Sequence, residues 1–478
     1  MPFNSIPFFI FFLLFTIAYY LIPSTGIKIG VLILGSYFFY AHAGVHHLAF
    51  LLLVTTITYL ISQTNKKSGI NRVILLSGIV SIVALLLTTK YASVLLGDWS
   101  SINFSEGNLW ANLVVPLGIS FYSLQAISLL VDLYKGRYLQ PLTLKDVSLY
   151  LSFFPQAMAG PIHRADELIP QFRNVGKFTS AHVVFGLKTM LHGYFCKLII
   201  ADKVSLIITP IFNAWDKFDG LSLLIATSLY SFQIYFDFWG YSLIAIGVGR
   251  VLGFKINVNF VAPYSVSSFK AFWHRWHITL SRWMRDYIYI PLGGNRLTFI
   301  RFCFAISITF LVSGIWHGVT INFLLWGGVH AVLYLVEDII RRQCKNFGYN
   351  QLSSQAFKIF QPFRWFMFFL AISFTWLIFR TENTHSLCGM VSKIFTLRDW
   401  SVSMTYDYYF SGINIVYLFV ISVAFVISHA LSKFINTQVS SPVLKRKLLV
   451  ESLFVCICLL SIILLGDMGG QEFLYFKF

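Results

Sequence analysis

Two stretches of the chain carry the most information about its fold. Residues 272–296 have the sequence FWHRWHITLSRWMRDYIYIPLGGNR, and residues 313–318 have the sequence SGIWHG. Together they place a histidine, His317, inside a long apolar run and close to a basic segment that is rich in tryptophan. Because an ionisable side chain within a bilayer is costly, this histidine predicts a functional site in a membrane protein.

The composition of the chain also predicts a membrane protein. Hydrophobic residues make up 57% of the 478 residues, and charged residues only 12%. No strand pattern with regularly spaced turns occurs, so we expect an all-α polytopic fold of about eleven or twelve transmembrane helices, with re-entrant and interfacial helices between them. The predicted spans are residues 6–22, 27–41, 46–63, 72–89, 109–134, 182–200, 221–250, 299–318, 320–340, 364–380, 413–431 and 448–466.

The formal charge of +17 predicts an orientation in the membrane rather than a nucleic-acid partner. Lys and Arg gather in the cytoplasmic loops of polytopic proteins. The early basic residues fall on alternate loops: Lys28; then Lys66, Lys67 and Arg72; then Lys135, Arg137 and Lys145. We therefore expect the N-terminus to lie outside the cytoplasm.

We expect one integral-membrane domain over residues 1–478, because no linker tract and no internal repeat divides the chain. The apolar run at 147–160 is too short to span a bilayer, and its Pro155 and Gly160 predict a re-entrant or interfacial segment. The polar stretches 161–181 and 381–412 are predicted to be loops. The six cysteines are scattered without CxxC spacing, which predicts neither disulfides nor a structural metal.

Residues 269–287 predict one amphipathic helix at the membrane interface. Its apolar face holds Trp273, Trp276, His277, Leu280, Trp283, Met284 and Tyr287, and its polar face holds His274, Arg275, Ser281, Arg282, Arg285 and Asp286. His277 is unusual, because an imidazole occupies a position where a leucine is expected.

Two roles fit this helix. It could anchor the protein to the membrane surface. Alternatively, it could bind an anionic acyl donor, because the guanidinium group matches the geometry of phosphates. The arginines that would converge there are Arg275, Arg282, Arg285, Arg296 and Arg301.

His317 is predicted to lie near the tip of a helical hairpin. A helix over 299–318 places it about 24 Å from Arg301, at 1.5 Å per residue, and the next span turns back from Gly318. A histidine there could take the proton of a hydroxyl group during acyl transfer, or simply bond to another helix. Ser313, one turn earlier, could orient the imidazole. Asn322 and His330 add polar groups on the returning span, and we expect His330 to support packing.

Asp237 lies among aromatic residues within the span 221–250. A carboxylate in such surroundings must be paired, hydrogen-bonded or neutral. No second carboxylate stands nearby in sequence to form a catalytic pair. We therefore predict a structural role, in which Asp237 bridges helices through an arginine or backbone amides.

These motifs together resemble the membrane-bound O-acyltransferase family, and within it the alginate O-acetyltransferase branch. The resemblance is densest over 153–330. Its blocks are FFPQAMAGPI at 153–162, QIYFDF at 233–238, WHITLS at 276–281, RDYIYIPLGGNR at 285–296 and GIWHG at 314–318, followed by the tail EFLYFKF at 472–478.

The resemblance implies two functional histidines, His317 as the catalytic one and His277 as the other. It also implies a central funnel reaching His317, a cytoplasmic thioester donor and a periplasmic acyltransferase partner. The residues expected to bind or support the donor are Arg275, Trp276, Arg282, Arg285, Asp286, Asn295, Arg296, Trp316 and Asn322. The chain departs from the family pattern at Trp239 and Leu243, where Ser and Asp are expected, and this predicts a changed acceptor side.

The resulting hypothesis is a multi-pass O-acyltransferase of the bacterial inner membrane. It would move an acyl group, with acetyl favoured, from acetyl-coenzyme A or an acyl-carrier-protein thioester to an alginate-like exopolysaccharide or to peptidoglycan, without a metal. A D-alanyl transferase acting on teichoic acid is the alternative within the enzyme class. A transporter or flippase is the alternative from another class.

Overall fold

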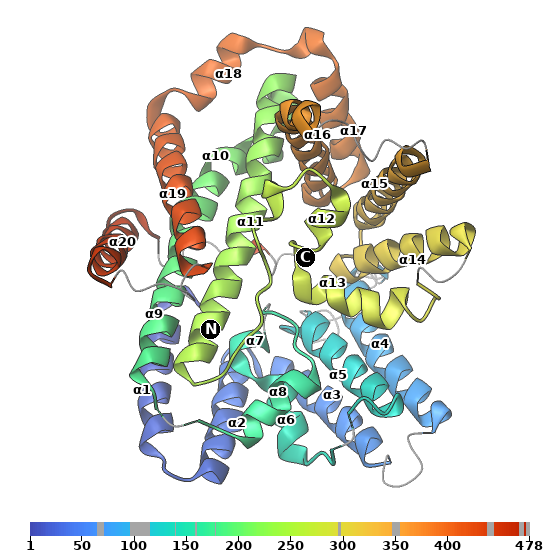
Figure 1. Cartoon of the computed structure of the whole chain (residues 1–478), viewed down its shortest axis with the longest axis vertical. Helices are drawn as coiled ribbons and strands as arrows, with labels where there is room; N and C mark the ends of the chain where they lie inside the picture. The colour runs from blue at the N-terminus through green and yellow to red at the C-terminus, as the bar shows by residue number, and fades with distance from the viewer. Residues whose placement is uncertain are drawn as a thin grey trace, which may run out of the picture. The chain divides into compact units, whose positions relative to one another are not determined.

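The computed structural model describes residues 1–64, 71–95, 115–138, 140–157, 160–176, 178–294, 298–346, 354–436, 444–467 and 473–474. Every regular element among these residues is a helix (Figure 1). The predicted all-α class is therefore confirmed.

Among the described residues, six helices are long and apolar enough to cross a membrane. They are α3 (Val45–Gln63), α4 (Arg72–Leu95), α11 (Gly220–Val251), α14 (Phe299–His317), α15 (Ile321–Asn346) and α16 (Ser354–Arg380). A seventh span results if α18 (Val402–Tyr409) and α19 (Gly412–Asn436), which meet at a bend of 74°, count as one. The protein is thus a multi-pass membrane protein.

Each predicted span also contains a helix, although several are short. The remaining ones are α1 (Ile6–Leu21), α2 (Thr25–Ala41), α5 (Ile119–Tyr134), α9 (Ser180–Tyr194) and α20 (Leu444–Leu465). The number of eleven or twelve crossings stays a prediction, because length and composition identify six or seven.

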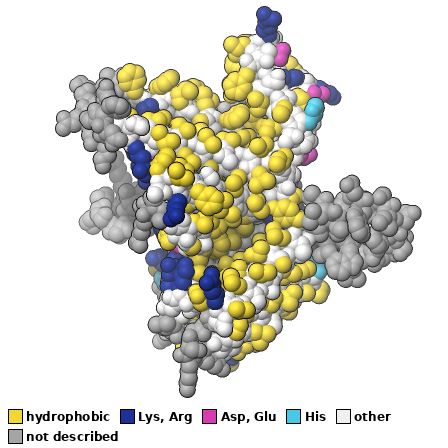
Figure 2. Space-filling view, turned by 90° about the vertical axis from the view of Figure 1, so that its right-hand side faces the viewer, with side chains coloured by type: hydrophobic (Ala, Val, Ile, Leu, Met, Phe, Trp, Pro, Cys, Tyr) yellow, Lys and Arg dark blue, Asp and Glu magenta, His cyan; other side chains and the backbone are white. Residues whose placement is uncertain are grey.

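Hydrophobic side chains cover much of the described surface in the view of Figure 2. Along α1, Ile10, Leu13, Leu14 and Ile17 are all exposed. Exposed apolar surface on this scale is unfavourable in water but suits contact with lipid.

Two compact units make up the described chain. The first comprises Met1–Thr189 and Ala245–Val258, and the second comprises Met190–Ile244 and Asn259–Phe478. The single-domain organisation stays a prediction. The tryptophan-rich basic segment that begins at residue 272 and the residues 313–318 both lie in the second unit.

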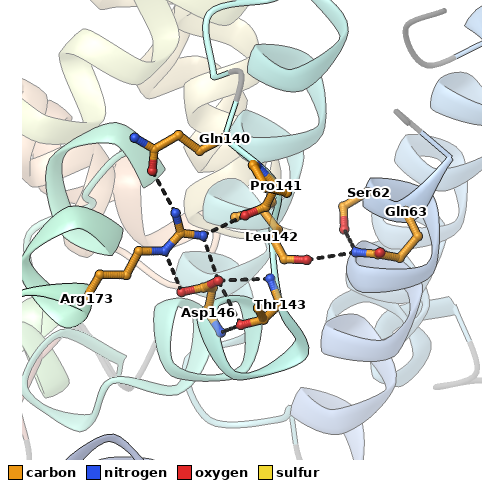
Figure 3. Close-up of polar contacts among 8 residues, drawn as sticks. All are labelled: Ser62, Gln63, Gln140, Pro141, Leu142, Thr143, Asp146 and Arg173. Carbon is orange, nitrogen blue, oxygen red and sulfur yellow. Dashed lines mark hydrogen bonds and ion pairs between the residues drawn. The ribbon is translucent and has the colours of Figure 1, made fainter. Parts of the chain in front are cut away.

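The first unit contains a polar cluster that joins three helices (Figure 3). Arg173, at the end of α8 (Ala165–Arg173), donates to both carboxylate oxygens of Asp146 in α6 (Leu144–Ser152), at 3.1 and 2.8 Å. It also donates to Gln140 Oε1 and to the carbonyl of Pro141. Gln63 of α3 donates to the carbonyl of Leu142 at 2.9 Å. These bonds hold α3, α6 and α8 together.

Near α6, the structure differs from the prediction for residues 161–181 and adds detail to the prediction for residues 147–160. Residues 161–181, predicted to be a loop, contain α8, at whose start the backbone amide of Arg164 donates to Glu167 Oε2 at 3.3 Å. The short apolar run at 147–160 is divided by Phe153 between α6 and α7 (Phe154–Ala157), and its residues 147–156 are buried.

The second unit contains η2 (Phe195–Ala201), α10 (Asp202–Asn213), the 3-10 turns η3 (Trp215–Lys217) and η4 (Pro263–Ser265), and α17 (Thr384–Phe395). The prediction of a loop over residues 381–412 is wrong, because α17 and α18 lie there. Their N-terminal residues, Asn383 and Ser401, supply the side-chain oxygens that cap them.

The hairpin of α14 and α15 is present as predicted, and Figure 1 shows the two helices side by side. Glycine permits their close approach. A Cβ atom on Gly314 would lie 2.3 Å from the carbonyl oxygen of Phe323, and one on Gly327 would lie 2.5 Å from that of Phe310.

Candidate active site

The segment 269–287, which the sequence predicted to be one helix, is interrupted in the structure. It divides into α12 (Phe269–Trp273), α13 (Ile278–Met284) and the π-helical turn η5 (Arg285–Tyr289). His277 adopts φ 42°, in the left-handed region, which interrupts a right-handed helix.

The interruption has a clear cause in backbone pairing. The amide of Ile278 donates to the carbonyl of Asn259 at 2.9 Å, and the amide of Val261 donates to the carbonyl of Arg275 at 3.0 Å. Backbone hydrogen bonds to the non-helical segment 259–261 therefore replace helical hydrogen bonds around His277. The break turns Trp276 and His277 into buried residues, with 4% and 2% exposure.

His277 is held by Asn259. The Oδ1 atom of Asn259 accepts from the amide of Thr279 at 3.2 Å and from its hydroxyl at 2.9 Å. The same oxygen lies 3.2 Å from Nδ1 of His277. Because Oδ1 only accepts, Nδ1 must carry the proton, and Nε2 therefore presents a lone pair. Burial lowers the pKa of His277, which keeps the imidazole neutral near pH 7.

His317 is the last residue of α14 and is also buried. Its ring centroid lies 5.1 Å from that of Trp326, 5.3 Å from that of Phe379 and 4.9 Å from that of Trp316. The Trp316 ring lies in turn 6.2 Å from the ring of His277. The fold thus brings both predicted histidines next to one indole, that of Trp316.

A cavity of about 640 Å³ lies between the α12–α13–η5 segment and the α14–α15 hairpin. Its exposed basic lining residues are Arg282, Arg285, Arg341 and Arg342, and Lys270 adds a partly exposed ammonium group. Its inner lining includes Trp273, Phe302, Ile306, Phe310 and Ser313. The cavity is therefore basic on its exposed side and apolar inside.

The basic groups differ in how far they are already paired. Arg285 pairs with Asp286 at 2.8 Å, and both Arg341 and Arg342 pair with Asp338. In the parts of the chain that the structure describes, no ion pair engages Lys270 or Arg282.

The predicted donor-binding residues are only partly gathered at this cavity. Arg282 and Arg285 line it, whereas Arg275 donates to Ser265 Oγ at 2.9 Å instead. Asn295 and Arg296 lie outside the described residues. Trp276 packs on Trp376, with 4.7 Å between ring centroids.

The contribution of α15 to the cavity was not predicted from the sequence. Arg341, Arg342 and Asp338 line the cavity from the C-terminal end of that helix. The hairpin itself was a sufficient signal, because the end of its second helix must return to the start of its first.

The other predicted polar residues have defined partners or positions. Ser313 is buried and lines the inner cavity. Asn322 donates to the carbonyl of Thr381 at 2.8 Å and so joins α15 to the end of α16. His330 is fully buried among aromatic rings.

Asp237 pairs with a lysine rather than with the expected arginine. The Nζ atom of Lys197 lies 2.6 Å from Asp237 and 2.9 Å from Asp202. The backbone amide of Leu474 donates to Asp237 at 2.9 Å, and the Phe473 ring lies against the same ammonium group. The tertiary fold thus brings together two carboxylates that are distant in sequence. These contacts support the structural role predicted for Asp237.

Among the described residues, no group of three or more His, Cys, Asp and Glu side chains is arranged to hold a metal ion.

Comparison with known proteins identifies the family. The model of the membrane-bound O-acyltransferase family matches residues 36–380. The probable alginate O-acetylase AlgI of Pseudomonas putida is 30% identical over 503 residues, which cover 100% of both chains. The chain belongs to the membrane-bound O-acyltransferase family.

Two further relatives differ in their acceptors. The peptidoglycan O-acetyltransferase of Helicobacter pylori is 33% identical over 75% of this chain and 73% of its own length. The teichoic acid D-alanyltransferase of Bacillus subtilis is 28% identical over 49% of this chain and 62% of its own. The protein is thus an O-acyltransferase, and the transporter alternative is set aside.

Proposed function

We propose that the protein takes an acetyl group from a cytoplasmic thioester and delivers it across the bacterial inner membrane to a cell-envelope or exported polysaccharide. His317 acts as the base on the accepting hydroxyl, or as an acyl relay. His277 positions the thioester. The arginines near the cavity bind the phosphates of the donor.

The cavity beside the α14–α15 hairpin is the observation that carries this proposal. Coenzyme A and carrier-protein donors both join an anionic phosphate region to a long arm that ends in a thioester. A basic exposed side and an apolar interior match these two regions. The inner end of the cavity reaches Ser313, which is one helical turn from His317.

With His317 as the base, each bond and each proton in the reaction can be followed. The imidazole takes the hydroxyl proton as the oxygen attacks the thioester carbonyl, and an ester bond forms. The carbon–sulfur bond then breaks, and the thiolate leaves with the proton from the imidazolium. The role of His277 is supported by its tautomer, whose Nε2 lone pair can accept a hydrogen bond from an amide N–H of the arm that carries the thioester.

The relatives support a glycan acceptor, either an alginate-like exopolysaccharide or peptidoglycan. Trp239 replaces a small residue of the family pattern and stacks on Tyr235, with ring centroids 5.3 Å apart. A bulky ring there favours an acceptor other than alginate itself. A periplasmic acyltransferase would complete the transfer.

Replacing His317 tests the proposal. The His317→Ala protein should lose acylation of envelope polysaccharide by at least about a hundredfold, the usual effect of removing a general base. Mass spectrometry of the polymer from wild-type and variant cells measures the product, and membrane expression is the control. Wild-type acylation in the variant would defeat the assignment of His317, and a D-alanyl product would support the teichoic acid alternative instead.

A further inference from the structure

A cluster of aromatic nitrogen groups lies between the cavity and His317. It consists of Trp273 from α12 and of Trp326 and His330 from α15, all in the second unit. The ring centroid of His330 lies 5.0 Å from that of Trp273 and 4.8 Å from that of Trp326. The two indole centroids are 5.9 Å apart.

The polar atoms of this cluster lack protein partners. Both indole Nε1 atoms and both ring nitrogens of His330 are buried without a hydrogen-bond partner among the described residues. Trp326 is 1% exposed and His330 0%. Buried polar atoms are nearly always hydrogen-bonded, and leaving them unpaired costs free energy. Four such atoms in one cluster therefore indicate a ligand site more than simple packing.

The cluster touches both parts of the proposed site. Trp273 and Phe310 line the cavity, and the Phe310 ring stacks on His330 with centroids 6.0 Å apart. On the other side, the Trp326 ring meets the His317 ring at 5.1 Å. Trp273 is thus the member of the cluster that lines the cavity, and Trp326 packs between Trp273 and the proposed base.

The hydrogen-bonding capacity of the cluster defines a class of ligand. Each indole offers one donor, and a neutral imidazole offers one donor and one acceptor. A thioester carbonyl accepts hydrogen bonds, and a secondary amide both accepts and donates. Both groups occur at the reactive end of a pantetheine arm, whether coenzyme A or a carrier protein holds it.

We propose that Trp273, Trp326 and His330 bind the carbonyl and amide groups of the donor's pantetheine arm and position its thioester beside His317. This inference rests on the proposed function and gives His330 a binding role in place of the packing role expected from the sequence. It also separates donor recognition into two parts. The basic residues of the cavity bind the phosphates, and the cluster binds the arm.

Equilibrium binding to the purified full-length protein tests this division. The probes are acetyl-coenzyme A and S-acetylpantetheine, which lacks the nucleotide and its phosphates. His330→Phe should raise the Kd of both probes about tenfold, which is the effect of one or two lost hydrogen bonds. His330→Gln should restore much of the affinity, because an amide both donates and accepts. Arg282→Ala should weaken only acetyl-coenzyme A.

The possible outcomes are distinct. Wild-type affinity of the His330→Phe protein for both probes overturns the inference and leaves the proposed function standing. So does an equal loss in His330→Phe and His330→Gln together with a lower Tm, because that pattern indicates packing alone. If the wild-type protein binds neither probe, both this inference and a coenzyme A donor are wrong.

Discussion

His277 and His317 are both buried histidines, but the backbone presents them differently. His317 ends a regular helix, whereas His277 stands in a left-handed conformation between two short helices. Such a conformation is uncommon outside glycine and persists only where the surroundings hold it. At this site the surroundings are the backbone of 259–261 and the side chain of Asn259. The ring of His277 is thereby oriented by contacts that a helix would not provide.

Replacing Asn259 should therefore impair the site through His277. We expect Asn259→Ala to lower acyl transfer by roughly tenfold to a hundredfold, since small misplacements of catalytic groups have effects of this size. The release of free thiol from acetyl-coenzyme A measures the change. Asn174→Ala is the matched control, because that exposed asparagine only bonds to its own helix. Full activity of the Asn259 variant would show that His277 needs no such support.

At the scale of elements, the site depends on two helices that meet through glycine. The α14–α15 hairpin carries His317 on one helix, and Asn322, Trp326 and His330 on the other. Its close packing sets how these residues face one another. In the first unit, an ion pair holds two helices together instead of close glycine packing, since Arg173 and Asp146 join α8 to α6.

The glycines of α15 provide a direct comparison. Gly327→Ala places a methyl group 2.5 Å from a carbonyl oxygen of α14, so we expect a loss of about 1–3 kcal/mol in stability and reduced acyl transfer. Gly328→Ala meets nothing within 4 Å and should be neutral or stabilising by up to about 1 kcal/mol. Thermal unfolding in detergent measures both. Equal Tm values for the two variants would contradict the packing of the hairpin.

The Asp146 cluster predicts how stability depends on pH. Burial alone would raise the pKa of the Asp146 carboxyl, but hydrogen bonds from Arg173 and Thr143 outweigh it and hold the pKa below its usual value. A lowered folded-state pKa stabilises the protein above the unfolded pKa of about 3.9, and this stability is lost as the pH falls through the folded-state value.

Asp146→Asn should accordingly lower the Tm by the equivalent of about 1–2 kcal/mol between pH 5 and pH 8. The difference from the wild type should shrink below about pH 4. Unfolding curves across this range test the expectation, with the exposed Asp399→Asn as control. A difference that stays constant down to the lowest pH would rule out an ionised Asp146.

At the scale of the whole molecule, the charge pattern predicts how the chain crosses the membrane. The basic loop residues Lys66 and Lys67 should lie in the cytoplasm, and the loop around His42 outside it. Alkaline phosphatase, which folds only outside the cytoplasm, should therefore be active when fused after Ala43 and at least about tenfold less active when fused after Lys67. The reverse pattern would invert the topology and the proposed direction of transfer.

The sequence alone determined the features that arise from local pattern. Apolar runs of sufficient length identify helices, and an ionisable residue within such a run marks a site. The all-α class and the hairpin of α14 and α15 could be predicted in this way, whereas the family was predicted from the resemblance of an ordered set of motifs. The helices at 165–173, 384–395 and 402–409 could not, because they are short and depend on capping and packing.

Only the tertiary structure decided which distant groups meet. Periodicity predicted a continuous helix over 269–287, and pairing with residues 259–261 overrode it. Lys197 lies between Asp237 and Asp202, and Arg341 and Arg342 return to the cavity beside Arg282. The physical reason is that hydrogen bonds and ion pairs act between atoms that are close in space. Local patterning reveals each of those groups but not its partner.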